Sequence, residues 1–551
     1  MTPPMPLLQA ARDWLADDPD PATRAELAEL IARVEEGVDA EQARADLADR
    51  FAGMLQFGTA GLRGELGAGP NRMNRAVVIR AAAGLAAWVR AHDGGGVVVG
   101  FDARRNSAVF AADTCAVMEA AGVEAMVLPR PLPTPVLAFA VRHLGADAGV
   151  MVTASHNPPN DNGYKVYVGD GSQIAPPVDT EIAAQIAAVT RVAGVPRADD
   201  GWVTMDDALV EAYLDRAVGV LDPSGPRDLA VVYTPLHGVG RDLLLAAFTR
   251  AGFPAPSVVP EQGEPDPAFP TVAFPNPEEP GALDAALARA DAEGAHLVIA
   301  NDPDADRCAV AVPDRDGTWR MLTGDEVGVL LGAHLIARGA RGTFANSIVS
   351  STLLGKVARA AGVEHVETLT GFKWITRAPG LRYGYEEALG YCCDPEAVKD
   401  KDGVTAALLV AELAASLQAR EATLLDRLND LAREHGVHLT SQVSVRVEDV
   451  ARIGEVMARL RTHPPTRLAD VAVVGVDDLL APGGPLPPTD GLRFRLDGQA
   501  RVIVRPSGTE PKVKCYLEVV QPVTDEDVEG ARAVGGRRMQ ALKDQMSLLL
   551  T

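Results

Sequence analysis

The sequence contains few cysteines. Five occur among 551 residues, their number is odd, and no two have the spacing of a CxxC pair. Disulfide frameworks and zinc sites usually need paired cysteines at regular spacing. We therefore expect reduced, small, buried side chains rather than cross-links or metal ligands. The five positions are Cys115, Cys308, Cys392, Cys393 and Cys515.

Long apolar runs and an excess of basic charge are also lacking. No stretch approaches the roughly 20 apolar residues of a transmembrane helix. The N-terminus has neither the basic start nor the apolar segment of a signal peptide. The net charge of −23 disfavours nucleic acid and anionic membranes as partners, because both bind basic surfaces. We expect a cytoplasmic monomer or dimer that binds small molecules, and any phosphorylated ligand would need a local cluster of Arg and Lys.

The chain is too long for one hydrophobic core, so several domains are expected. Between about residues 45 and 440, short Val/Ile/Ala-rich strands alternate with Ala/Leu-rich helices, which predicts mixed α/β sheets covered on both faces. Strands followed by a last helix then predict an α+β domain. Pro/Gly-rich stretches mark the boundaries. We expect N-terminal helices over 1–45, α/β domains over 46–205, 206–318 and 319–437, and the α+β domain over 438–551.

The N-terminal segment carries clear helix signals. Asp20 is a candidate N-cap and Pro21 follows at the first turn. A single apolar stripe then predicts the buried face of this helix. It consists of Leu27, Leu30, Ile31 and Val34.

Three carboxylates alternate in "HLVIANDPDADR", directly after an apolar strand. Asp302, Asp304 and Asp306 can point to one side of an extended loop. Hard oxygen donors without His or Cys suit Mg²⁺, and suit Ca²⁺ or Mn²⁺ less clearly. An EF-hand is excluded because Arg307 and Pro313 occupy its Gly and Glu positions. The alternative is a solvated acidic turn, and Arg307 could hold a phosphoryl oxygen.

A second strand ends in "VMVTASHNPPNDNGYKVY", which brings Ser155 and His156 into a loop. Ligands of open α/β sheets gather at the carboxyl ends of strands, so this loop could meet the acidic one. A phosphorylated Ser155 would donate a phosphoryl group and complete a metal site. His156 and Lys165 are candidates for proton transfer and charge stabilisation. Taken alone, a Ser-His dipeptide is more often an ordinary turn.

A third stretch, "RVIVRPSGTEPKVKCY", predicts a phosphate cradle. Hydroxyls, an arginine fork and a glycine that permits close backbone approach suit a phosphate. The GxxxxGK[ST] spacing of a Walker A loop is missing, and a basic surface turn is the alternative. The residues are Arg505, Ser507, Gly508 and Thr509, with Lys512 and Lys514 following.

Together these stretches resemble a known family. "TASHNPPNDNGYKVY", "DPDADR", "GYEEALGY" and "RPSGTEPKVKCYLE" are similar to the four signatures of the α-D-phosphohexomutases, the phosphoglucomutases and phosphomannomutases. "FGTAGLRGELGAGPNRMN" and "TLTGFKW" resemble more narrowly the phosphoglucomutase-2 and phosphopentomutase branch. The resemblance spans about residues 45–520 and implies four domains around a central cleft, the first three of related α/β topology.

The resemblance also implies roles for individual residues. Ser155 would be the phosphoserine, and its phosphate with the three aspartates would hold Mg²⁺. Lys401 in "DKDG" would serve proton transfer or electrostatics, with Lys399 as a nearby alternative. Arg63 would lie against the phosphoserine region, and Glu387 would hold sugar hydroxyls. Thr370 and Lys373 in "LTGFKW", together with Arg307, Arg505, Ser507, Gly508, Thr509 and Lys514, complete the expected substrate contacts.

The predicted reaction interconverts the 1- and 6-phosphates of glucose or mannose through a phosphoserine enzyme. A sugar 1,6-bisphosphate would be the intermediate and activator. Leu389 stands where many hexomutases have a serine, so a phosphopentomutase or a sugar-1,6-bisphosphate synthase is the main alternative. Two other classes are an aspartyl phosphatase and a non-catalytic sugar-phosphate-binding protein. We expect structural roles for His237 and Trp374, whereas Asp102 and Arg104 could serve either loop hydrogen bonding or the site.

Overall fold

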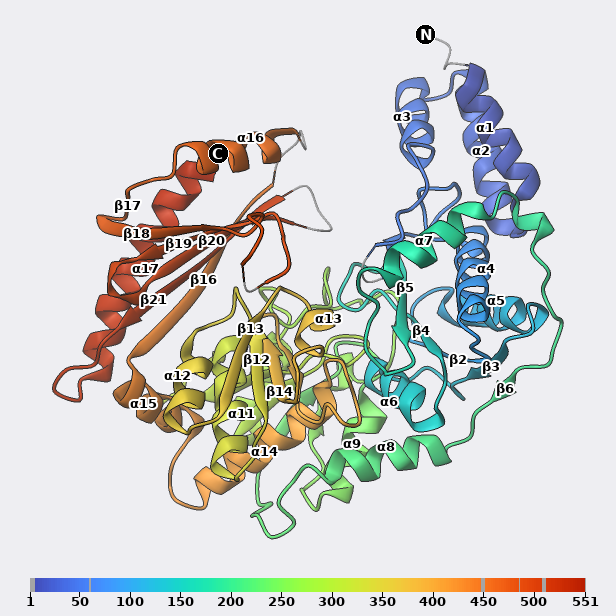
Figure 1. Ribbon diagram of the computed structural model, residues 1–551. Coiled ribbons are helices and arrows are strands. Elements are labelled where there is room, and N and C mark those ends of the chain that lie inside the picture. The colour runs from blue at the N-terminus through green and yellow to red at the C-terminus, as the bar shows by residue number, and fades with distance from the viewer. Residues whose placement is uncertain (1–4, 59–60, 447–450, 485, 508–511, 551) are drawn as a thin grey trace. The chain divides into compact units, whose positions relative to one another are not determined.

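The computed structural model describes residues 5–58, 61–446, 451–484, 486–507 and 512–550 (Figure 1). The chain forms two compact units. Unit 1 comprises residues 1–321 and 390–415, and unit 2 comprises residues 322–389 and 416–551.

The N-terminus of unit 1 is helical, with α1 (Met5–Asp17), α2 (Pro21–Glu36) and α3 (Ala40–Arg50). Asp20 caps α2, because its side chain accepts a hydrogen bond of 2.9 Å from the backbone N–H of Ala22. The predicted apolar stripe is buried, as expected. Its members Leu27, Leu30, Ile31 and Val34 form a small core with residues of α1 and α3.

The first sheet of unit 1 has the strand order β1-β5-β4-β2-β3-β6. Its β2, β3, β4 and β6 are parallel, whereas β5 and β1 continue the sheet antiparallel. Helices cover both faces: Val97 and Val99 pack in the core with α4 and α5, whereas Gly149 lies against Val141 of α6. The strands are β1 (Leu62–Glu65), β2 (Gly96–Phe101), β3 (Glu124–Val127), β4 (Ala148–Val152), β5 (Asp161–Val168) and β6 (Val203–Thr204). The helices are α4 (Arg75–Ala91), α5 (Ser107–Ala120), α6 (Thr134–Leu144) and α7 (Val178–Ala188).

The second sheet of unit 1 has the order β11-β10-β9-β7-β8, with β7 parallel to β8 and β9. Its strands are β7 (Val231–Thr234), β8 (Ser257–Val258), β9 (Leu297–Ala300), β10 (Ala309–Pro313) and β11 (Trp319–Met321). Its helices are α8 (Ala208–Val218), α9 (Arg241–Arg250) and α10 (Asp284–Glu293). Unit 1 also holds β15 (Gly390–Cys392) and most of α14 (Gly403–Gln418).

Unit 2 combines a parallel α/β layer with an antiparallel sheet. In the first, β12 lies parallel between β13 and β14. The second has the order β16-β21-β20-β19-β18-β17, and α16 and α17 contribute apolar side chains to its core. The α/β elements are α11 (Gly324–Ala337), β12 (Thr343–Ser347), α12 (Leu353–Ala360), β13 (Glu364–Thr368), α13 (Phe372–Ile375), β14 (Leu381–Glu386) and α15 (Leu424–His435). The last elements are β16 (Val437–Arg446), α16 (Ala451–Thr462), β17 (Arg467–Leu468), β18 (Val471–Asp478), β19 (Leu492–Leu496), β20 (Arg501–Pro506), β21 (Lys512–Gln521) and α17 (Val528–Leu550).

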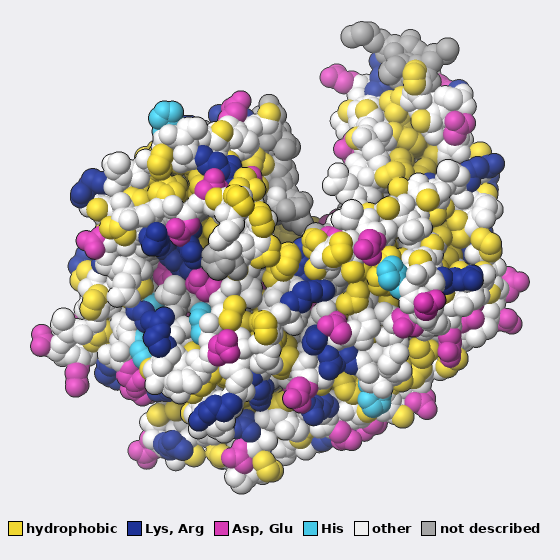
Figure 2. Space-filling model, viewed as in Figure 1, with side chains coloured by type: hydrophobic (Ala, Val, Ile, Leu, Met, Phe, Trp, Pro, Cys, Tyr) yellow, Lys and Arg dark blue, Asp and Glu magenta, His cyan; other side chains and the backbone are white. Residues whose placement is uncertain are grey.

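These elements confirm the predicted fold class of mixed α/β sheets with a C-terminal α+β domain. All five cysteines are free and buried, as expected. Among the described residues, no helix is both long and apolar enough to cross a bilayer. On the visible face, acidic and basic side chains are interspersed over the surface (Figure 2).

Candidate functional site

The loop after β4 holds Ser155 in a left-handed conformation, with a φ of 51°. A residue with a Cβ adopts this conformation at a cost of about 1–2 kcal/mol, so its surroundings must stabilise it. Arg104 supplies that support from the loop after β2. Its guanidinium donates hydrogen bonds to the carbonyl oxygens of Ser155 (2.5 Å), Asn157 (2.6 Å), Pro158 (2.8 Å) and Asp161 (3.1 Å).

Arg104 is itself fixed by its neighbours. Its guanidinium carbon lies 4.8 Å from the ring centroid of Phe269, and its backbone N–H donates to Asp102 Oδ1 at 3.0 Å. The same oxygen accepts from Ser107 Oγ at 2.6 Å. Of the two alternatives for Asp102 and Arg104, loop hydrogen bonding therefore describes their contacts, and the loop they hold carries Ser155.

The acidic triplet follows β9 and is completely buried. Asp302, Asp304 and Asp306 are at most 1% exposed, and one carboxylate oxygen from each lies within 4.8 Å of the others. Ser155 Oγ donates a hydrogen bond of 2.6 Å to Asp302 Oδ2. Two loops from different sheets of unit 1 thus bring a serine hydroxyl against three carboxylates.

Two lysines converge on the triplet. Lys165 Nζ, on β5, lies 2.6 Å from Asp304 Oδ2 and 2.8 Å from Asp306 Oδ2. Lys401 Nζ lies 3.1 Å from Asp306 Oδ2, whereas Lys399 Nζ contacts Asp170 at 2.8 Å. Lys401, rather than Lys399, therefore faces the acidic triplet.

The "DKDG" segment is held against the triplet loop by close packing. A Cβ on Gly403 would lie 2.3 Å from the carbonyl oxygen of Arg307, so only glycine permits this approach. Asp400 accepts hydrogen bonds from Tyr167 OH at 2.7 Å and Gln173 Nε2 at 2.8 Å. Asp402 accepts from the backbone N–H groups of the first turn of α14. Buried contacts of Asp400 on one side and of Asp402 and Gly403 on the other therefore fix the backbone that orients Lys401.

Charge in this centre is only partly compensated. Burial, together with Asp304 and Asp306, raises the pKa of Asp302 well above its usual value. Burial and Asp306 act to raise the pKa of Asp304, but Lys165 outweighs them and the pKa lies below its usual value. Burial also opposes ionisation of Asp306, yet Lys165 and Lys401 lower its pKa. Lys165 and Lys401 pair with Asp304 and Asp306, whereas the Arg307 guanidinium lies 4.0 Å from Asp302, so a further positive charge would stabilise the ionised form of Asp302.

The donor set fits a divalent cation. Asp304 Oδ1 and Asp306 Oδ1 are buried and have no hydrogen-bond partner among the described residues, although buried acceptors are nearly always paired. All the candidate ligands are oxygens, which Mg²⁺ prefers. The residues present can therefore hold such an ion with Ser155 beside it.

The remaining predicted residues of unit 1 surround the serine loop. His156 Nδ1 lies 3.1 Å from Ser155 Oγ, and burial, Arg307 and Arg63 lower the pKa of His156 well below its ordinary 6.5. Arg63 Nη1 donates to Asn157 Oδ1 at 3.1 Å. The backbone N–H of Arg307 donates to Asp302 Oδ1 at 3.1 Å, and its side chain lies 4.0 Å from Asp302 and Asp306. Cationic side chains thus gather where a phosphoryl group attached to Ser155 would need them.

The other predicted residues belong to unit 2. Glu387 follows β14, and its Oε2 accepts hydrogen bonds from Ser347 Oγ at 3.1 Å and Ser350 Oγ at 3.0 Å. Leu389 is fully buried with a φ of 63°. Thr370 and Lys373 lie half-buried in the segment that leads from β13 into α13.

The predicted phosphate cradle lies in the hairpin between β20 and β21. Arg505 is opposite Lys514 in the strand register, and the backbone N–H of Ser507 donates to the carbonyl oxygen of Lys512 at 2.8 Å. Gly508 and Thr509 lie outside the described residues.

Sequence reasoning gave Thr134 no role at the site. Thr134 begins α6, and its hydroxyl donates to Asp304 Oδ2 at 2.6 Å. A hydroxyl at the start of a helix carries no local signal that it will meet a carboxylate 170 residues away. His237 and Trp374 have packing contacts, in agreement with their expected structural roles. His237 Nε2 lies 2.8 Å from Thr271 Oγ1, and Trp374 packs against a buried apolar cluster.

Comparison with known proteins places this site in a family. Models of the phosphoglucomutase/phosphomannomutase α/β/α domains I, II and III match residues 54–193, 211–317 and 323–434, and the model of the C-terminal domain matches residues 443–533. The chain is 46% identical to a probable phosphomannomutase of Haemophilus influenzae, over 81% of this chain and 93% of the relative.

Other relatives agree over most of the chain. A phosphopentomutase of Mus musculus is 34% identical, over 95% of this chain and 91% of its own length. A crystal structure from Thermus thermophilus superposes with a TM-score of 0.69 at 27% identity and covers 89% of this chain and 99% of its own. The chain therefore belongs to the α-D-phosphohexomutase family and is an intramolecular phosphotransferase, an isomerase of the phosphoglucomutase and phosphomannomutase type.

Proposed function

We propose that the protein is a Mg²⁺-dependent phospho-sugar mutase that interconverts hexose 1-phosphate and hexose 6-phosphate, with glucose or mannose as the sugar. The observation that carries the proposal is the 2.6 Å hydrogen bond from Ser155 Oγ to Asp302 Oδ2, inside a buried triplet of carboxylates. Aspartyl oxygens and a phosphoserine oxygen would hold Mg²⁺, which supplies positive charge to the transferring phosphoryl group.

The proposed reaction has two phosphoryl transfers. In the first, the bond between phosphorus and Ser155 Oγ breaks while a bond forms to the free hydroxyl of the sugar monophosphate. The hydroxyl proton would pass to a neutral group of the site, for which His156 is the candidate, and the leaving Ser155 oxygen would take up a proton, for which Lys401 is the candidate donor. The resulting 1,6-bisphosphate reorients and returns its other phosphoryl group to Ser155, so no phosphate is released and no oxidant is needed.

The surrounding residues would position the reactants and stabilise charge. Lys165 and Arg307 would face the transferring phosphoryl oxygens, and Arg63 would hold the serine loop through Asn157. Glu387 would bind sugar hydroxyls, Thr370 would contact the sugar phosphate, and Lys373 would be a further substrate contact. The non-reacting phosphate would be held by Arg505, Ser507, Gly508, Thr509 and Lys514.

Replacing the serine tests the proposal directly. We expect Ser155→Ala to lower mutase turnover by at least about 1,000-fold, because the phosphoryl carrier is lost. Intact-mass spectrometry should find one phosphate on the wild-type chain and none on the variant. Ser224→Ala, in an exposed turn, is the control and should keep both the phosphate and the activity. Near-normal turnover by Ser155→Ala, or phosphate release that is independent of Ser155 as in an aspartyl phosphatase, would refute the mechanism.

One observation favours a second candidate within the same chemistry. Leu389 is buried and offers no hydroxyl at a sugar-loop position, and relatives named phosphopentomutase and glucose 1,6-bisphosphate synthase cover over 90% of this chain. Assays with the 1-phosphates of glucose, mannose, ribose and deoxyribose separate the two mutases. Net accumulation of the bisphosphate would identify a synthase.

A further inference from the structure

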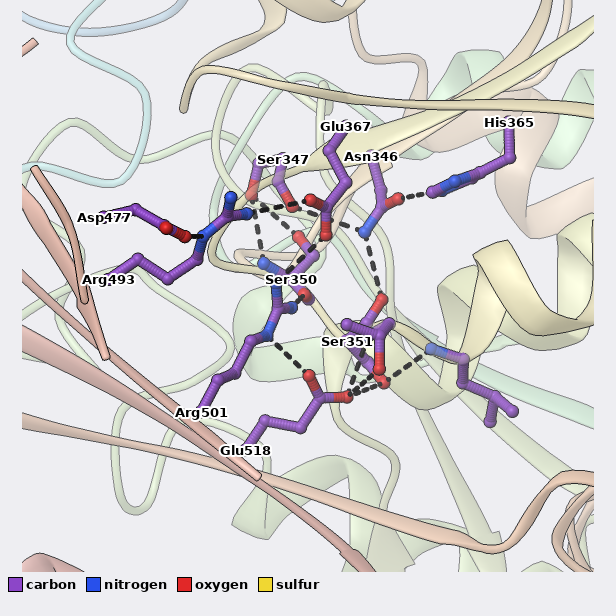
Figure 3. Close-up of polar contacts among 12 residues, drawn as sticks. Asn346, Ser347, Ser350, Ser351, His365, Glu367, Asp477, Arg493, Arg501 and Glu518 are labelled. Atoms are coloured by element: carbon purple, nitrogen blue, oxygen red, sulfur yellow. Dashed lines mark hydrogen bonds and ion pairs between the residues drawn. The ribbon is translucent and has the colours of Figure 1, made fainter. Parts of the chain in front are cut away.

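A buried polar network in unit 2 surrounds the segment 347–352, which begins at the last residue of β12 (Figure 3). Its serines Ser347 and Ser350 are fully buried, and their hydroxyls lie 2.9 Å apart. Buried hydroxyls need partners, and here the partners include a carboxylate on a different loop. That carboxylate is Glu387.

The contacts of Ser350 fix both the backbone and the side chain of Glu387. Ser350 Oγ accepts a hydrogen bond of 3.0 Å from the backbone N–H of Glu387 and donates one of 3.0 Å to its Oε2. Ser347 Oγ lies 3.1 Å from the same carboxylate oxygen. Since both serines contact Oε2, the orientation of the carboxylate is set and Oε1 is left for other partners.

Ser350 is in turn held by a strand of the C-terminal sheet. Arg501, only 7% exposed, donates from Nη2 to the carbonyl oxygen of Ser350. Its Nε donates to Glu518 Oε2 at 2.7 Å and its Nη1 to Glu367 Oε1 at 3.0 Å. Figure 3 shows this fork, with Arg493 and Asp477 extending the network on one side.

Glu518 also contacts the segment 347–352, at the residues that follow Ser350. It lies opposite Arg501 in the register of β20 and β21. Its Oε1 accepts from Ser351 Oγ at 2.9 Å and from the backbone N–H of Thr352 at 2.8 Å. One buried ion pair therefore holds the segment at three consecutive residues, Ser350, Ser351 and Thr352.

We propose that Ser350 is a positioning residue for Glu387 and that the Arg501–Glu518 pair fixes Ser350. This inference rests on the proposed function, because it requires that Glu387 binds the sugar. A buried ion pair contributes little net stability, since desolvation offsets most of the attraction. Its directional hydrogen bonds do fix geometry, and binding groups need support that holds them within a fraction of an ångström.

A double-mutant cycle between Ser350 and Glu387 tests the proposal in the full-length protein. We expect Ser350→Ala to lower kcat/KM for the sugar phosphate about 10-fold and Glu387→Ala to lower it about 100-fold. The double variant should match Glu387→Ala, because a positioning residue has no effect once its target is removed. Ser172→Ala is the control: this buried hydroxyl also bonds a carboxylate, that of Asp170, and its loss should leave kcat/KM unchanged.

The outcomes separate this inference from the proposed function. If Glu387→Ala is impaired but the two effects multiply in the double variant, Ser350 acts on kcat/KM independently of Glu387 and this inference fails alone. If Glu387→Ala keeps full activity, the sugar-binding role fails and takes the inference with it. Arg501→Lys gives an independent reading, because lysine keeps the charge but cannot serve three acceptors as a fork. Arg501→Lys should lower kcat/KM in the wild-type background and not in the Glu387→Ala background. Circular dichroism establishes that the Arg501→Lys variant is folded.

Discussion

The serine–aspartate centre of unit 1 and the Arg501–Glu518 network of unit 2 both bury charge, but they treat it differently. In unit 1, Asp304 Oδ1 and Asp306 Oδ1 have no hydrogen-bond partner within the part of the chain that the structure describes. In unit 2, both oxygens of Glu518 accept hydrogen bonds. Unpaired buried acceptors are costly unless a ligand completes them. The contrast separates a centre whose carboxylate oxygens could receive a cation, as proposed above, from a network whose central carboxylate already has partners on both oxygens.

The largest expected effect comes from Asp302→Asn. It should lower mutase turnover by at least about 1,000-fold, because an anionic ligand for the proposed Mg²⁺ is lost. It should not lower the melting temperature measured without Mg²⁺, since Asp302 is a buried acid with a raised pKa. Added Mg²⁺ should raise the melting temperature of the wild type and not that of the variant. A marked loss of stability of Asp302→Asn in metal-free buffer would contradict the comparison between the two buried charge clusters.

Glu518→Gln should show the opposite pattern to Asp302→Asn, with its main effect on stability. It leaves the buried Arg501 guanidinium with the Glu367 carboxylate but without that of Glu518, and the loss of one partner of a buried ion pair costs about 3 kcal/mol of unfolding free energy. Burial opposes ionisation of Glu518, but Arg501 and His438 hold its pKa below the usual value. Its contribution is therefore present above pH 4.5 and is lost as the pH falls through the folded-state pKa. Denaturant unfolding should show that the unfolding free energies of the wild type and Glu518→Gln converge at low pH. The exposed Glu529→Gln is the control.

The smallest effect is expected for Asp325→Asn, which changes another buried acid of unit 2. Burial raises the pKa of Asp325 to about 7, and Glu387 and Glu518 act in the same direction. The wild type is stabilised by the protonated form below the unfolded pKa of about 3.8, and it loses this stability as the pH rises to about 7. Asparagine keeps the acceptor for the backbone N–H of Ser351 and cannot ionise. The melting temperature of the variant relative to wild type should therefore rise between about pH 4 and 7 and then level off; a flat difference would argue against the raised pKa.

Local features of the molecule were predictable from the sequence. Asp20 and Pro21 predicted the start of α2, and the apolar stripe predicted its buried face. The alternation of short apolar strands with helices predicted the mixed sheets. These features depend on contacts within a few residues along the chain, which composition and periodicity encode directly. The resemblance to the phosphohexomutases supplied Lys401 and Glu387, whose roles no local pattern indicates.

The sequence alone thus determined which loops carry hydroxyls, carboxylates and basic groups, because each motif is local. Only the tertiary structure decided how they meet. Ser155 reaches Asp302 across 147 residues, Lys401 faces the triplet where Lys399 does not, and Arg104 holds the serine loop from a neighbouring strand. Strand order and the approach of loops follow from packing over the whole chain, so the partners of a buried polar group are set by the fold and not by its neighbours in sequence.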